Sequence, residues 1–137
     1  MRAADLMTND VFTLPVTATV ADAVSLIAEN EVRHIPLVDA DGRLSAVLSD
    51  RDVRRIDGLL AVDVGDAEAA EHVLAAPITG LVGGPPLSID TTTEVDDIID
   101  VFLAERVGAL VVTDPDQRVV GIVSVLDVLA AAKGRLG

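Results

Sequence analysis

A Ser-x-x-Asp pattern that occurs twice has the clearest potential for chemistry in this sequence. The two copies are Ser49 with Asp52 and Ser124 with Asp127, and each precedes an apolar run with helical spacing. A carboxylate can accept hydrogen bonds from two vicinal hydroxyl groups, and the free N–H groups at a helix start favour an anion. The same pattern is also a capping box, which needs no ligand. The motif alone leaves both interpretations open.

Basic residues are few and unevenly placed. The 137-residue chain has 23 acidic and 10 basic side chains, a net charge of −13, and Lys133 is its only Lys. A planar guanidinium can engage two phosphate oxygens at once, so a run of Arg marks where a phosphate would bind. Solvated pairing with Asp is the alternative. The run between positions 33 and 55 consists of Arg33, Arg43, Arg51, Arg54 and Arg55.

Composition excludes several classes of protein. Hydrophobic residues make up 50% of the chain and aromatic residues 1%, so the core must come from Ala, Val, Leu and Ile. Proteins that hold single-stranded nucleic acid use stacking rings in a positive groove, which does not fit this acidic chain. The sequence has no Cys and two isolated His, so we expect no catalytic residues, no metal site and no required cofactor. Because no 18-residue apolar stretch occurs, we expect a cytoplasmic protein without membrane contact.

The chain contains an internal repeat. A shift of 75 positions aligns residues 6–53 with 81–128 without a gap. Self-similarity at a fixed spacing predicts two copies of one structural unit. The identical pairs are Leu6/Leu81, Thr17/Thr92, Val20/Val95, Asp22/Asp97, Val32/Val107, Asp39/Asp114, Asp41/Asp116, Arg43/Arg118, Ser49/Ser124, Asp52/Asp127 and Val53/Val128.

Hydrophobic periodicity predicts the elements of each copy. Helical spacing indicates helices over 20–28 and 95–103, and a second helix follows each Ser-x-x-Asp motif. Thr19 with Asp22 fits a capping box, and Thr93 with Asp96 fits one a position earlier in the second copy. Short apolar runs predict strands over 11–14, 35–38, 44–48, 87–89, 110–112 and 119–123.

These elements predict an α+β fold of two β-α-β-β-α repeats. We expect the first repeat over 1–60, an Ala- and acid-rich insert over 61–76 with a helix at 67–75, and the second repeat over 77–137. A unit of about 60 residues buries little surface alone. The two copies should therefore pack pseudo-symmetrically into one globule with a cleft on the internal twofold axis.

The ordered set of segments resembles a tandem pair of CBS (cystathionine β-synthase) domains, a Bateman module. The resemblance covers nearly the whole chain, and its segments are Ala-Asp-Leu-Met-Thr-Asn-Asp-Val at 4–11, Val-Arg-His-Ile-Pro-Leu-Val-Asp at 32–39, Val-Gly-Ala-Leu-Val-Val at 107–112 and Gly-Ile-Val-Ser-Val-Leu-Asp at 121–127. It implies that clefts between the repeats hold adenosine-containing ligands, such as AMP, ADP, ATP or S-adenosylmethionine, and that modules pair into flat dimers.

The resemblance also implies roles for particular residues. In the family motif Gly-hydrophobic-x-Ser/Thr-x-x-Asp, the Asp takes the ribose hydroxyls and the Ser or Thr lies by the ribose or phosphate. The second copy has Gly121 in this motif, whereas Ala46 replaces the glycine in the first. The residues expected at ribose and phosphate are Ser49, Asp52, Ser124, Asp127, Arg33, His34 and Arg51, and those expected at the base are Val11, Thr13, Leu87 and Ile89.

The two copies differ where a phosphate would bind. Arg33 and His34 align with Gly108 and Ala109, and Arg51 aligns with Leu126, so the first copy alone is suited to phosphate. His34 as a packed strand residue is the alternative. We expect a regulatory module that senses an adenosine compound and acts on another polypeptide as a homodimer. A ligand-free dimerisation or interaction module is the second hypothesis. Binding of a divalent cation, through the acidic surface or together with a nucleotide, is a third.

Overall fold

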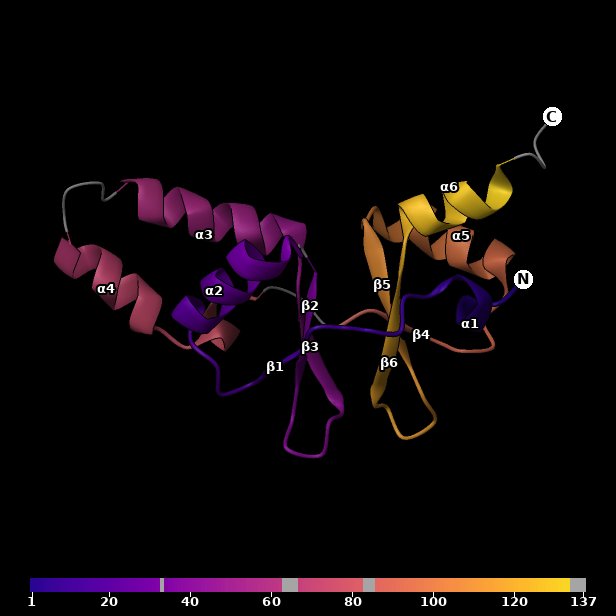
Figure 1. Ribbon diagram of the computed structural model, residues 1–137, viewed down its shortest axis with the longest axis horizontal. Helices are drawn as coiled ribbons and strands as arrows, with labels where there is room; N and C mark the ends of the chain where they lie inside the picture. Colours follow the sequence, from indigo (N-terminus) through magenta and orange to yellow (C-terminus); the bar gives the residue numbers. More distant parts are fainter. Residues whose placement is uncertain (33, 63–66, 83–85, 134–137) are drawn as a thin grey trace. The chain divides into compact units, whose positions relative to one another are not determined.

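Two three-stranded sheets, one from each sequence repeat, organise the structure (Figure 1). The computed structural model describes residues 1–32, 34–62, 67–82 and 86–133. Two compact units divide the chain. Unit 1 consists of Met1–Val11, Asp41–Leu44 and Leu87–Gly137, and unit 2 of Phe12–Ala40 and Ser45–Pro86. This mixed helix and strand architecture confirms the predicted α+β fold of paired repeats.

Unit 2 is built around the first sheet. In this sheet β1 is parallel to β2, and β3 follows β2 on its other side. The helix predicted at 67–75 is confirmed as α4, which packs against α2 and α3. The elements are β1 (Leu14–Pro15), α2 (Val20–Asn30), β2 (Ile35–Val38), β3 (Leu44–Leu48), α3 (Asp50–Val62), α4 (Ala67–Ala75) and the 3-10 helix η1 (Ile78–Leu81).

Unit 1 repeats this arrangement around the second sheet. Here β4 is parallel to β5 and β5 is antiparallel to β6. The register Ile89↔Val112 matches Leu14↔Leu37 in unit 2 after the shift of 75 positions. The elements are α1 (Ala3–Leu6), β4 (Ser88–Asp90), α5 (Val95–Glu105), β5 (Ala109–Thr113), β6 (Val119–Ser124) and α6 (Val125–Ala132).

The first predicted strand is largely wrong. The apolar run indicated a strand over 11–14, but β1 contains only Leu14 and Pro15. A strand exists only where a neighbour supplies hydrogen bonds, and β2 offers β1 the two partners Leu37 and Val38. Hydrophobicity marks residues that can be buried but does not show where their partner strand ends.

Aliphatic side chains form both cores, as the composition predicts. Each core lies between a sheet and its helices. Phe102 is the one aromatic residue among the buried members of either core, and it belongs to unit 1. The core of unit 2 contains Ala18, Val20, Ala23, Ile35, Leu37, Leu48, Val53, Ile56 and Ile78. The core of unit 1 contains Ala3, Ile89, Ile98, Phe102, Leu110, Val112, Val123 and Val128.

The segment that opens each repeat packs into the core built from the other repeat. In unit 1 the Ala3 N–H donates to the Thr93 carbonyl at 2.9 Å. In unit 2 the Ile78 N–H donates to the Ala18 carbonyl at 3.0 Å, and these positions are equivalent after the shift of 75. Ala3 and Ile78 are both fully buried. The N-terminal segment therefore belongs to the core built from the second repeat.

A second pair of equivalent hydrogen bonds ties each segment to a helix start. The Val95 N–H at the start of α5 donates to the Met1 carbonyl at 2.8 Å, and the Val20 N–H at the start of α2 donates to the Ala76 carbonyl at 2.9 Å. Free N–H groups at a helix start require partners outside the helix. The docked segments supply these partners.

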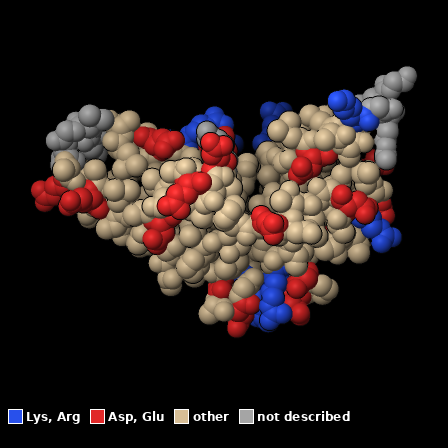
Figure 2. Space-filling view, viewed as in Figure 1, with Lys and Arg blue, Asp and Glu red and all other residues tan. Residues whose placement is uncertain are grey.

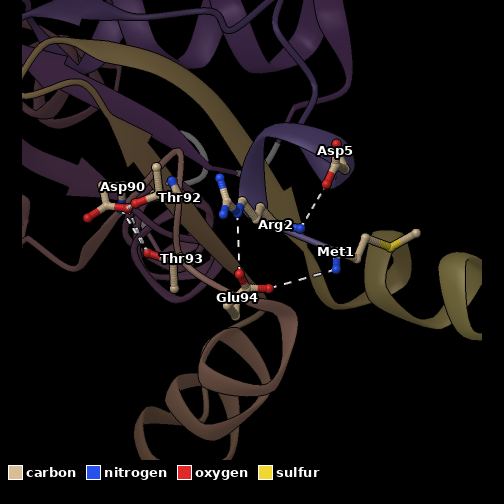
Figure 3. A network of polar contacts seen from close by, with 7 residues as sticks. All are labelled: Met1, Arg2, Asp5, Asp90, Thr92, Thr93 and Glu94. Atoms are coloured by element: carbon tan, nitrogen blue, oxygen red, sulfur yellow. Dashed lines mark hydrogen bonds and ion pairs between the residues drawn. The ribbon is translucent and has the colours of Figure 1, made fainter.

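Polar contacts surround the docked N-terminal segment (Figure 3). The Glu94 carboxylate lies 3.8 Å from the Met1 amine and 3.3 Å from Arg2 Nε, and the Arg2 N–H donates to Asp5 at 2.8 Å. Exposed ion pairs of this kind contribute little free energy. Burial of Ala3 and the backbone bonds therefore hold the segment, and the charges orient it.

Of the caps predicted for the first helix of each repeat, the one at Thr19 is confirmed and the one at Thr93 is wrong. Thr19 accepts from the Asp22 N–H at 3.3 Å, and the Thr19 N–H donates to the Asp22 carboxylate at 2.9 Å. The helix α5 instead begins after Glu94, without a side-chain cap. Thr93 does not cap with Asp96 because its hydroxyl is engaged by Asp90, donating to that carboxylate at 3.2 Å and accepting from its N–H at 3.2 Å.

The helices α2 and α5 each end on a residue in the left-handed conformation. Glu31 follows α2 with φ 53°, and Arg106 follows α5 with φ 55°. A side chain in this region strains the backbone, which is why glycine is favoured there.

We expect Glu31→Gly and Arg106→Gly each to raise the free energy of unfolding by about 0.5–1 kcal/mol, because glycine removes this strain. Chemical denaturation measures the change. Glu29→Gly, two residues earlier within α2, is the matched control and should lower stability by about 1 kcal/mol. A loss of stability at all three positions would contradict the strain argument.

The turn after β4 lowers the pKa of Asp90. The Thr92 hydroxyl donates to Asp90 Oδ1 at 2.7 Å and has the largest effect, and the Thr92 N–H donates to the same oxygen at 2.9 Å. Thr93 contributes further hydrogen bonds, and desolvation opposes them. Hydrogen bonds that favour the ionised carboxylate hold its pKa below the ordinary value of 3.8.

Thr92→Val should therefore raise the pKa of Asp90 toward 3.8, which an NMR titration of the carboxyl carbon measures. A lowered folded-state pKa stabilises the protein above the unfolded value, and this contribution disappears as the pH falls through the folded value. The stability difference between wild type and Thr92→Val should thus shrink below pH 3.8. Thr91→Val is the control that leaves the Asp90 pKa in place, and an unchanged pKa in Thr92→Val would refute the assignment.

Candidate functional site

Both Ser-x-x-Asp motifs form capping boxes. In unit 2 the Ser49 N–H donates to Asp52 Oδ2 at 2.9 Å, and the Asp52 N–H donates to Ser49 Oγ at 3.3 Å. In unit 1 the Ser124 N–H donates to Asp127 Oδ2 at 2.8 Å, and the Asp127 N–H donates to Ser124 Oγ at 3.1 Å. Each motif thus positions its carboxylate at a strand-to-helix junction, at the start of α3 or α6.

Capping leaves part of each carboxylate available. Within the described part of the chain, every hydrogen bond to Asp52 or Asp127 ends on Oδ2, including one from Ser49 Oγ at 3.0 Å. Asp52 is only 4% exposed, yet no side-chain oxygen there is both fully buried and unsatisfied among the described residues. A carboxylate has about four acceptor positions. Oδ1 can therefore accept from a ligand while Oδ2 holds the cap.

Two of the three basic residues expected at a phosphate lie in the described part of the chain. Arg33 lies outside the described residues. His34 is half-buried immediately before β2 and already has a partner, and Arg51 is exposed in the first turn of α3, next to Asp52. Other arginines of the run have structural contacts: Arg54 pairs with Asp50, and Arg55 donates to the Leu81 carbonyl at 3.3 Å. Arg51 is thus the member on the same helix turn as the capping carboxylate.

A backbone hydrogen bond that the sequence did not reveal joins the residue before β5 to the first residue of α6. In unit 1 the Val125 N–H donates to the Gly108 carbonyl at 3.1 Å. Gly108 is the equivalent of Arg33, and Val125 begins α6 beside Ser124. The segment before the middle strand therefore lies against the capping box in this fold. A long-range backbone bond of this kind leaves no residue-type signal.

The residues expected at a base are divided between the units. Val11, Leu87 and Ile89 belong to unit 1, together with Asp127, and Thr13 belongs to unit 2, together with Asp52. Thr13 is exposed, while Val11 and Leu87 are half-buried. Ile89 is 8% exposed and part of the unit 1 core. Thr8 pairs with Ile122 through two backbone bonds of 2.9 and 3.1 Å, which brings the segment leading to Val11 beside β6.

Gly121 has a structural explanation that needs no ligand. A Cβ on this buried glycine would lie 2.5 Å from Met7 Sδ and 2.9 Å from Met7 Cγ. The docked N-terminal segment therefore requires a residue without a side chain here. In the first repeat the equivalent Ala46 is half-buried and packs against the core of unit 2.

Neither a metal cluster nor a membrane span is found in the described residues. No three or more His, Asp or Glu side chains gather so that they could hold a metal ion in residues 1–32, 34–62, 67–82 and 86–133. Over the same ranges, no helix has both the length and the apolar character needed to cross a membrane.

The chain belongs to the CBS domain family, because the model of that family matches residues 3–58 and 79–134. A protein of Thermofilum pendens, the uncharacterized 33.4 kDa protein in ribosomal RNA operon, is 35% identical over 116 residues. That match covers 81% of this chain, which spans 38% of the relative's length. The family assignment confirms the tandem CBS pair that the sequence resembled.

Solved structures agree with this fold. The structure of CBSX2 in complex with AMP has a TM-score of 0.79 at 24% identity and covers 99% of this chain and 98% of its own. A CBS domain protein from Pyrobaculum aerophilum complexed with AMP has a TM-score of 0.74 at 25% identity, with 93% of this chain and 89% of that chain covered.

Gly121→Ala should lower the free energy of unfolding by about 1–3 kcal/mol, because the added methyl group overpacks against Met7. Thermal or denaturant unfolding measures this loss. In a Met7→Ala background the same substitution should cost clearly less, since most of the clashing atoms are gone. Equal costs in both backgrounds would show that the glycine is required for another reason.

Proposed function

We propose that this chain is a regulatory module that binds an adenosine-containing ligand and acts on another polypeptide. The proposal rests chiefly on the Oδ1 atoms of Asp52 and Asp127, which stand at helix starts and have no partner among the described residues. A CBS domain protein of the same fold at 25% identity has been solved with AMP, which supports this ligand class. AMP, ADP, ATP and S-adenosylmethionine all carry the adenosine group.

The ribose is the part that the two carboxylates would recognise. Its 2′ and 3′ hydroxyls are vicinal donors, and a carboxylate accepts from both while its second oxygen keeps the helix cap. The Ser49 and Ser124 hydroxyls lie within 3.3 and 3.1 Å of the Asp N–H groups that they cap. Each hydroxyl would therefore lie beside the sugar bound by its own motif. The free N–H groups in the first turn of each helix would favour a phosphate attached to that sugar.

The two motifs would prefer different ligands. Arg51 stands one residue before Asp52 and is exposed, whereas the equivalent Leu126 precedes Asp127. A guanidinium forms charge-assisted hydrogen bonds to phosphate and leucine forms none. We therefore assign the phosphate-bearing ligand to the motif of unit 2, with His34 and Arg33 as further phosphate contacts. An uncharged adenosine group suits the motif of unit 1.

The base would be held by aliphatic groups and backbone. Val11, Thr13, Leu87 and Ile89 remain the proposed base contacts, with Ile89 acting through the core that it stabilises rather than through an exposed side chain. The module would bind without catalysing a reaction, require no cofactor and work in the cytoplasm. Its effector would be a separate polypeptide, and the chain would act as a homodimer.

Arg51→Ala should weaken AMP binding by about 10-fold or more, because a hydrogen bond to a charged group contributes about 1.5–3 kcal/mol, while adenosine binding stays unchanged. Isothermal titration calorimetry with both ligands measures this split. Arg54→Ala is the matched control, since Arg54 is on the same helix but pairs with Asp50. AMP affinity should be unaffected there.

The same titrations separate ligand binding from capping alone. Asp52→Asn and Asp127→Asn each retain an amide oxygen for the cap, so the protein should stay folded while its ribose contact weakens. If both variants lose stability without any change in the heat of binding, the carboxylates serve only as caps. If AMP, ADP, ATP and S-adenosylmethionine all give neither heat nor a thermal shift at millimolar concentration, the sensor proposal is wrong.

A further inference from the structure

Sulfur is present at two positions of this chain, because the sequence has two Met and no Cys. Met1 is 44% exposed, whereas Met7 is half-buried and packs against the core of unit 1. Of the two sulfur atoms, that of Met7 is therefore the one whose chemical state bears on the packing of the fold.

The Met7 sulfur lies directly on the backbone of β6. A Cβ on Gly121 would lie 2.5 Å from Met7 Sδ and 2.9 Å from Met7 Cγ, so this side of the sulfur has no room for one further carbon atom. Closely packed contacts of this kind transmit even small changes in volume. An oxygen atom added to the sulfur therefore requires the Met7 side chain to turn or move away from β6.

Met7 lies between two backbone contacts that dock the N-terminal segment, residues 1–8. Its N–H donates to the carbonyl of Ala3, which is fully buried, at 2.8 Å. The next residue, Thr8, exchanges two hydrogen bonds of 2.9 and 3.1 Å with Ile122 of β6. A displacement of the Met7 side chain therefore acts on both the buried end and the strand-paired end of the segment.

The fold does not require sulfur at this position. After the shift of 75 positions the equivalent residue is Val82, which packs against the core of unit 2. An aliphatic side chain thus serves in the other core. Methionine adds to this packing role the oxidation chemistry of a thioether.

We propose that Met7 is an oxidation site at which conversion of the thioether to a sulfoxide releases the N-terminal segment from unit 1. A sulfoxide is polar and accepts hydrogen bonds, whereas the contacts of this side chain with Gly121 and with the core are apolar. The oxidised side chain is therefore more stable in water than against β6. This proposal does not depend on ligand binding.

Release is favoured because the segment buries little else. Ala3 contributes a single methyl group, and Leu6 is the other large apolar side chain of the segment that packs against the core of unit 1. Oxidation of Met7 thus removes one of two large apolar contacts. The released sulfoxide is accessible to methionine sulfoxide reductases, which makes the change reversible.

A neutral peroxide is the oxidant that suits this surface. The chain carries a net charge of −13, and Figure 2 shows acidic side chains spread over the visible surface. Such a surface repels anionic oxidants but not hydrogen peroxide, which is small and uncharged.

The oxidation is a two-electron transfer to the peroxide. A sulfur lone pair attacks one peroxide oxygen, and the O–O bond breaks as the S–O bond forms. The proton of the attacked oxygen moves to the departing hydroxide, which leaves as water. The sulfur is thereby oxidised to the sulfoxide, and the peroxide is reduced.

Amide hydrogen exchange before and after treatment with hydrogen peroxide tests this proposal. Peptide mass spectrometry first shows whether Met7 has gained one oxygen atom. The N–H groups of Ala3, Thr8 and Ile122, which are hydrogen-bonded where the segment docks, should then exchange at least 10-fold faster. The Ile78 N–H makes the equivalent bond in unit 2, so it is the internal reference and should keep its rate.

Two substitutions separate the effect of the sulfoxide from other damage. Met7→Leu keeps the apolar volume and leaves Met1 as the only methionine, so peroxide should not change its exchange rates. Met7→Gln places a polar group of similar length at this position and should show the faster exchange without peroxide. Oxidised wild type treated with a methionine sulfoxide reductase and a thiol reductant should regain slow exchange.

Several results would overturn the proposal. These are a Met7 that stays unoxidised while Met1 gains oxygen, a Met7 sulfoxide that forms without faster exchange at Thr8 and Ile122, and a Met7→Leu variant that responds to peroxide as the wild type does. Slow exchange in Met7→Gln would show that polarity here does not release the segment. Exchange that stays fast after reduction of the sulfoxide would indicate damage elsewhere and would equally count against Met7.

Discussion

Each of the two cores is completed by a short docked segment that buries one small or branched side chain, Ala3 or Ile78. Each repeat is about 60 residues, a size at which a sheet and its helices bury little surface. Ala3 and Ile78 fill the two cores with fully buried side chains, and equivalent backbone bonds to Thr93 and Ala18 fix them. The segment around Ala3 also places Met7 over Gly121. The residue that fits at position 121 of β6 therefore depends on the segment that covers this strand.

The capping boxes connect stability with chemistry. Asp52 and Asp127 begin α3 and α6 through Oδ2, which fixes the direction of each carboxylate without consuming its second oxygen. A side chain that is already ordered by a helix cap loses little conformational entropy if it binds a ligand. Capping and ligand contact were alternatives for the motif as a sequence pattern. In the folded protein the cap occupies Oδ2 while Oδ1 accepts no hydrogen bond from the described residues, so the two interpretations are compatible.

The two repeats present different side chains at equivalent positions of their helices. The helix that follows the capping box carries Arg51 and Arg54 in the first repeat and Leu126 and Leu129 in the second. Guanidinium groups suit phosphate, and exposed leucines suit an apolar partner. Both helices begin at a capping box, so the difference between the repeats here lies in the side chains on one helix face.

Local patterns in the sequence are enough to identify the repeat, the fold class and most element bounds. It placed β2, β3 and α4 correctly and identified the capping boxes at Ser49 and Ser124, because hydrophobic period and cap chemistry are local. Contacts in the folded protein, in contrast, place Ala3 in the core of the second repeat and start β1 at Leu14. Docking and strand pairing join residues far apart in the chain, and no local pattern specifies which distant partner a segment meets.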